Sequence, residues 1–257
     1  MSLRIYQAAA ARAAEERRRL RLGSDPVMDI KALVEGQGVL VYSTAVAEGS
    51  LSGCFALING DPWMLVNTAQ TQGRQRFTIA HEYCHSLVDR ELEFVVCTRE
   101  KPQHEKFADA FAAAFLMPAD ATLAFFEPDA GKTVTAERVV DYCYAFGVSY
   151  QAAVYRIGGL RIATARQKDA LFQESPLRVA AAMGYDVRDV ASPFFSGDAD
   201  CRVTADTFPR AYRSAALQAF EQELISESKL AELLGVDADD LDELLDPVEA
   251  DDVPVAW

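Results

Sequence analysis

The residues with the clearest chemical potential are the two histidines of the segment His81-Glu82-Tyr83-Cys84-His85. Residues four apart on a helix share a face, so both imidazoles can meet one ion, and zinc–nitrogen bonds need about 2.0–2.1 Å. The carboxylate of Glu82 would then reach a water on that ion and not the ion itself. Because zinc lowers the pKa of such a water to about 7, Glu82 is predicted to be the general base in an attack on a peptide carbonyl. The competing interpretation is a pair of solvent-facing helix histidines without a metal.

A third protein ligand is expected, because a catalytic zinc keeps three protein ligands and one open position. Glu105 is the favoured ligand: Asp109 lies four residues later on the same helix face, where it can hold a ligand histidine by its free N–H. His104 is an alternative third ligand, and Glu105 would then be a first-turn residue favoured by the helix dipole. In a further alternative, Glu105 and Asp109 form a solvated face.

Two helices are predicted to position these residues. Apolar residues recur at intervals of three and four from residue 73 to about 89, which predicts a helix that carries the histidine motif. A second helix is predicted over about 103–117, with one broad face of phenylalanine and alanine, and Pro118 is expected to stop it.

The N-terminal part of the chain combines helical and strand patterns. Short apolar runs bounded by turn residues predict a small antiparallel sheet, which we expect to pack on the motif helix, with a turn at Asn59-Gly60-Asp61-Pro62. The three predicted strands are Val39–Tyr42, Cys54–Asn59 and Met64–Asn67. A polar, Arg-rich helix over 3–22 and a second helix over 27–35 precede them.

After residue 134 the sequence predicts helices only. Residues 135–146 and 149–160 resemble a helix-turn-helix around Gly147, a pattern that more often reflects plain packing. Residues 176–257 hold 18 Asp and Glu against 6 Lys and Arg, with helices expected near 211–224, 226–234 and 238–245. We therefore divide the α+β chain into residues 1–134, a helix-turn-helix-like segment 135–174 and an acidic, mainly helical region 175–257.

Composition excludes several classes of function. With a net charge of -14, we do not expect direct nucleic-acid binding, because phosphate binding requires clustered Lys and Arg. The five cysteines are scattered without a CxxC pair, which is typical of reduced intracellular thiols. No apolar run approaches the roughly 18 residues of a membrane span, so we expect a cytoplasmic protein without a membrane partner.

Two segments together carry a resemblance to a known family. The stretch from Arg74 to Glu82, followed by Glu105-Lys-Phe-Ala-Asp109-Ala-Phe-Ala-Ala-Ala-Phe-Leu-Met117-Pro118, resembles the bacterial ImmA/IrrE metallopeptidases. The resemblance covers roughly residues 5–165 and includes the helix and strand at 26–42 and Ser52-Gly53. It departs at Cys84, where the family usually has glycine; this thiol would be an extra ligand or a redox sensor if it lay close to the zinc, although a buried inert cysteine is commoner.

The resemblance implies a minimal zincin-like α+β domain of the gluzincin type, in which a zinc ion (Zn2+) is bound by His81, His85 and Glu105. Glu82 would be the catalytic glutamate. Members of the family typically cleave or inactivate a helix-turn-helix transcriptional repressor, which releases genes of mobile elements or of a stress response. The resemblance thus predicts a zinc metalloendopeptidase acting on a repressor; the alternative is a non-proteolytic regulator that binds and sequesters a repressor partner.

Overall fold

The computed structural model describes residues 2–46, 51–88, 94–96, 103–129, 131–196, 207–237 and 241. The chain divides into two compact units, residues 1–201 and 202–257. The division by composition proposed above, at 134 and 174, stays a prediction. Ala180 and Phe194 belong to the core of the first unit.

A four-stranded sheet lies in the first unit, in the order β1-β3-β2-β4. Its strands are β1 (Leu40–Thr44), β2 (Gly53–Ile58), β3 (Asp61–Asn67) and β4 (Phe94–Val96). The expected antiparallel sheet is wrong in one pairing: β1 runs parallel to β3, whereas β2 is antiparallel to both β3 and β4. The reason is that β3 lies between β1 and β2, and the tight turn at Asn59 and Gly60, both with positive φ, reverses the chain between β2 and β3. The sheet is therefore mixed.

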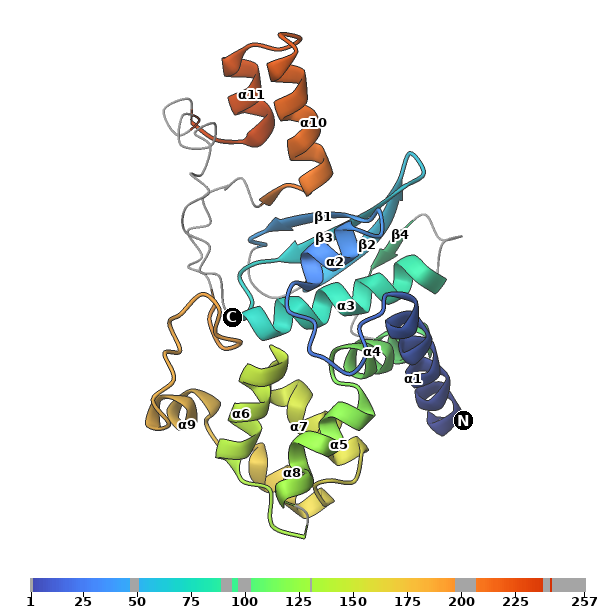
Figure 1. The fold of residues 1–257 in the computed structure, drawn as a ribbon, viewed down its shortest axis with the longest axis vertical. Coiled ribbons are helices and arrows are strands. Elements are labelled where there is room, and N and C mark those ends of the chain that lie inside the picture. The colour runs from blue at the N-terminus through green and yellow to red at the C-terminus, as the bar shows by residue number, and fades with distance from the viewer. Residues whose placement is uncertain are drawn as a thin grey trace. The chain divides into compact units, whose positions relative to one another are not determined.

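One face of this sheet forms part of the main core. Val41, Met64 and Val66 point from β1 and β3 into the core that also contains Ile79 and Tyr83. Those two residues belong to α3, which runs along this face of the sheet, with α2 on the same side (Figure 1). The helix α2 (Ile30–Glu35) begins later than expected from residue 27.

The motif lies in α3 (Gln72–Val88), and α1 (Ser2–Arg19) and α4 (Gln103–Leu116) lie next to this helix. All three helices were predicted, and the structure confirms them. The alanines of α4 allow close packing, since Ala108 and Ala112 have no exposed surface and α1 lies against this helix (Figure 1). Phe111 and Phe115 stack with their ring centroids 5.5 Å apart. The histidine motif and Glu105 are thus carried by helices that are fixed by an apolar core.

The rest of the first unit contains further helices. It contains α5 (Ala119–Phe126), η1 (Glu127–Asp129), α6 (Ala136–Phe146), α7 (Tyr150–Gly159), α8 (Ala165–Leu171) and α9 (Pro176–Ala182). The predicted pair on either side of Gly147 is confirmed: Thr135 and Ser149 cap α6 and α7, and Gly147 ends α6 in the left-handed conformation.

A segment from the end of the first unit closes the N-terminus of the motif helix. The backbone N–H of Gln72 donates to the carbonyl oxygen of Phe195 at 2.7 Å, and that of Gly73 donates to the carbonyl oxygen of Pro193 at 2.9 Å. A Cβ on Gly73 would lie 2.5 Å from the backbone nitrogen of Ser149, so only glycine fits here without a shift of the backbone. We call residues 193–196 the strap.

The second unit contains two described helices, α10 (Arg210–Glu221) and α11 (Glu227–Leu234). Both correspond to predicted helices, whereas the helix expected near 238–245 lies outside the described residues apart from Leu241. Ser226 caps α11, and Gly235 ends it with a φ of 64°. Leu230, Leu234 and Leu241 form a small core of this unit's own.

In the part of the chain that the structure describes, no single helix is long and apolar enough to cross a membrane. One bent pair, Gln103–Leu116 with Ala119–Asp129 at an angle of 54°, passes the same test of length and composition.

Candidate metal centre

The two motif histidines lie side by side on α3, as their spacing predicts. Their Nε2 atoms are 3.2 Å apart and their ring centroids are 5.0 Å apart. Only 10% of the His81 side chain and none of the His85 side chain is exposed. Two imidazole nitrogens therefore face the same point from consecutive turns of a helix.

Glu105 brings a carboxylate from α4 to the same point. Its Oε2 lies 3.3 Å from Nε2 of His81, and its Oε1 lies 3.4 Å from Nε2 of His85. The ligand atoms of His81, His85 and Glu105 all lie within 4.8 Å of one another, and among the described residues this is the one group of three such side chains that could hold a metal ion. Two neutral nitrogens and one carboxylate oxygen are a donor set that suits zinc.

Asp109 fixes the orientation of the first histidine. Its Oδ1 lies 3.0 Å from Nδ1 of His81, which leaves Nε2 directed at Glu105. Burial lowers the pKa of His81, but the hydrogen bonds to Asp109 and Glu105 outweigh burial and raise this pKa to about 9. A metal that binds at Nε2 must therefore displace a proton that His81 holds firmly.

Glu82 lies next to this group on α3, with 1% of its surface exposed. Strand β2 passes close to Glu82 and Thr78. A Cβ on Gly53 of this strand would lie 3.5 Å from Cγ of Glu82 and 2.5 Å from Cγ2 of Thr78. Any side chain at position 53 would push the strand away from α3. The close approach of β2 therefore explains why glycine stands there.

His104 and Cys84 lie outside the group of three. Nε2 of His104 is 3.5 Å from Oε1 of Glu105, and 45% of this side chain is exposed. The structure thus brings Glu105, and not the alternative His104, together with the two motif histidines. Cys84 has no exposed surface and belongs to the apolar core.

Sequence reasoning missed a buried polar network behind the motif. The hydroxyl of Tyr83 donates to Oε1 of Glu16 at 2.6 Å, and the guanidinium of Arg19 donates to the same oxygen at 2.6 Å. Burial of Glu16 raises its pKa, but these two hydrogen bonds and the nearby arginines have the larger effect and bring the pKa of Glu16 below its usual value. Next to it, Arg17 donates to the carbonyl oxygen of Phe115 at 2.6 Å, near the end of α4. The one signal in the sequence was the tyrosine inside the motif, whose hydroxyl needs a partner when it is buried.

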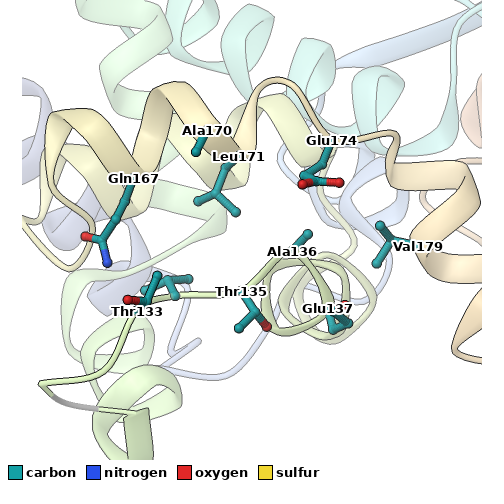
Figure 2. A pocket seen from close by; sticks show the side chains of 10 residues that line it. Thr133, Thr135, Ala136, Glu137, Gln167, Ala170, Leu171, Glu174 and Val179 are labelled. Carbon is teal, nitrogen blue, oxygen red and sulfur yellow. The ribbon is translucent and has the colours of Figure 1, made fainter.

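A separate pocket of about 290 Å³ lies between the start of α6, α8 and α9 (Figure 2). Leu171 and Val134 line it, and the carboxylates of Glu137 and Glu174 stand at its edge. None of the residues of the metal centre lines this pocket, so the two features are distinct.

The fold and the group of three define an α+β protein with a possible His/His/Glu metal site carried by two helices. Residues 34–158 match the family model Peptidase_M78, described as the IrrE N-terminal-like domain. Residues 34–158 therefore form a domain of the ImmA/IrrE-type family, which implies a metallopeptidase-like role. A comparison with curated proteins found no match.

Proposed function

We propose that this protein is a zinc-dependent endopeptidase with a zincin-like catalytic domain. The observation that carries the proposal is the convergence of His81, His85 and Glu105, with Glu82 one residue from the first ligand. Three protein ligands leave a fourth position for water or substrate, which is the arrangement of a catalytic and not of a structural zinc site.

In this proposal each side chain has one task. His81, His85 and Glu105 hold the ion, and Asp109 keeps the ring of His81 in place through Nδ1. When bound, zinc lowers the pKa of a water to about 7 and polarises the carbonyl of the substrate. Glu82 accepts a proton from the water as its oxygen bonds to the peptide carbon, and then returns that proton to the leaving amide nitrogen as the C–N bond breaks.

We further propose that the substrate is a helix-turn-helix transcriptional repressor, whose cleavage derepresses stress-response or mobile-element genes in the cytoplasm. The family supports this class of substrate. The net charge of -14 supports a partner with a basic surface, since DNA-binding surfaces carry clustered Lys and Arg. Direct binding of nucleic acid is disfavoured by the same charge, and Arg156, the one cation within α7, donates to the carbonyl oxygen of Met117 at 2.8 Å.

The metal can be tested by elemental analysis of the wild type, Glu82→Gln, Glu105→Ala and the exposed control Glu127→Ala. We expect about one zinc per chain in all except Glu105→Ala, because only this variant loses a ligand. Equal zinc in Glu105→Ala would contradict the ligand set.

Cleavage can be tested by labelling new protein N-termini in a lysate of the host cell after adding zinc-loaded protein. Termini within a repressor should form with the wild type and not with Glu82→Gln. If the wild type forms none, the sequestering regulator becomes the better proposal.

A further inference from the structure

His104 lies on the side of α4 that faces the metal centre. It is the second residue of α4, and it continues the helix stripe formed by Ala108, Phe111 and Phe115, all of which are fully buried. Its ring centroid lies 6.1 Å from that of His85, and its Nε2 lies 3.5 Å from Oε1 of Glu105. The imidazole therefore borders the group of three without being part of it.

Exposure distinguishes His104 from the metal-binding side chains. It is 45% exposed, whereas the side chain of Glu105 is 5% exposed and that of His85 has no exposed surface. A substrate must reach the centre from a side that is open to solvent, and His104 is a partly exposed N–H donor that borders the centre. Ionised carboxylates such as Glu82 and Glu105 can only accept hydrogen bonds, whereas an imidazole always carries at least one N–H.

We propose that His104 is a further catalytic residue, whose ring N–H donates a hydrogen bond to the oxygen of the scissile carbonyl. This inference rests on the proposed peptidase function. As the water oxygen bonds to the carbonyl carbon, the π electrons of the C=O bond move to its oxygen, and the water proton goes to Glu82. His104 transfers no proton; it stabilises the charge that develops on the oxygen, for which removal of one donor typically costs about 10²–10³ in kcat.

The test compares His104→Phe, which removes the donor, with His104→Gln, which keeps an N–H donor. Gln103→Ala, a change at the exposed neighbouring residue, is the control. Each protein is loaded with Co2+, and its affinity for acetohydroxamate, a small ligand with charged oxygens, is read from the visible absorption of the metal. This measurement requires no peptide substrate and no cleavage.

We expect one Co2+ per chain in all variants and an affinity for acetohydroxamate about tenfold weaker in His104→Phe, the size of one lost hydrogen bond to a charged oxygen. His104→Gln and the control should stay within about threefold of the wild type. An unchanged affinity in His104→Phe would overturn the assignment. Loss of Co2+ from His104→Phe would overturn it as well, because His104 would then be a ligand.

The two proposals fail in different ways. Weaker binding in His104→Phe without any cleaved protein in the lysate would support His104 as a hydrogen-bond donor to an oxygen at the metal, but it would overturn the peptidase function and with it the catalytic role of His104. Absence of Co2+ binding in every protein, the wild type included, would overturn both. Once a cleaved substrate is known, His104→Phe should lower kcat about 10²-fold and leave KM nearly unchanged.

Discussion

The pair α3 and α4 and the pair α6 and α7 both consist of consecutive helices, but they bury different chemistry. The first pair buries imidazoles and carboxylates that converge on one point. The second buries apolar side chains, including Val139, Val154 and Ile157. One cation that contacts the second pair serves its backbone: Arg76 of α3 donates to the carbonyl oxygen of Gly147 at 2.8 Å. Two packed helices therefore do not define a function by themselves; the groups that they bury do.

The largest loss of stability is expected at Arg76, which joins α3 of the first pair to the end of α6 in the second pair. Arg76 also donates to the carbonyl oxygens of Met28, at 2.5 Å, and of Val27. Arg76→Met leaves three carbonyl groups without this donor, so we expect a loss of about 4 kcal/mol in the free energy of unfolding. Urea denaturation measures it, and Arg74→Met, an exposed change on the same helix, is the control.

The zinc content of the same variant shows whether the metal-binding side chains are affected. Zinc per folded chain should stay the same in Arg76→Met, because no ligand changes. If Arg76→Met lost zinc but kept its stability, Arg76 would act on the metal site and not on the packing of the two helix pairs.

The second effect is a pH dependence that belongs to the metal centre alone. In the metal-free protein the pKa of His81 is about 9, above the value of about 6.5 expected in the unfolded chain. This histidine therefore stabilises the fold fully below pH 6.5, and the contribution of about 3 kcal/mol is lost as the pH rises through 9. Denaturation of EDTA-treated protein at pH 6 and pH 9 measures the loss.

Asp109→Asn is the matched variant for this pH dependence, since it removes the negative charge that raises the pKa of His81 and leaves only a neutral acceptor for Nδ1. Its stability should change less over the same interval. In the same interval zinc should bind more tightly as the pH rises, by up to roughly tenfold per pH unit below pH 9, because the proton on His81 competes with the metal. An affinity that is flat between pH 6 and pH 8 would contradict the assignment of His81.

The smallest effect is expected at Cys84, which lies inside the motif but packs in the apolar core. Cys84→Ala should lower the free energy of unfolding by about 1 kcal/mol, since it removes one buried atom. Zinc content and the loss of activity in peroxide should match the wild type. If Cys84→Ala resisted peroxide, the thiol of Cys84 would act at the metal site, and the hypothesis of a redox sensor would be supported.

Local spacing explains how much could be predicted from the sequence. The i,i+4 pairs His81/His85 and Glu105/Asp109 lie within single helices, so helical periodicity places each pair on one face. That the two pairs meet followed from the need for a third ligand and from the family resemblance, and their role as ligands stays a prediction. The alternatives involving His104 and a solvated Glu105 could be separated only by the packing of α4 on α3, which brings Glu105 to 4% exposure.

Contacts between distant residues could not be predicted in this way. The parallel pairing of β1 with β3 depends on which strand occupies the middle of the sheet, and the strands themselves carry no sign of it. The partner of Tyr83 is Glu16, 67 residues earlier, on a helix that looked merely polar and Arg-rich. Burial of that glutamate depends on how α1 packs against α4.

The strap has a consequence for the order in which the site is completed during synthesis. A chain leaves the ribosome N-terminus first, so α3 is made long before residues 193 and 195, whose carbonyl oxygens accept from its first turn. Closing so long a loop is a late folding event, because many residues must be ordered before the contact forms. The motif helix reaches its final form only after residue 196 has been made, and a fragment that ends at residue 158, where the family match stops, would lack these two acceptors.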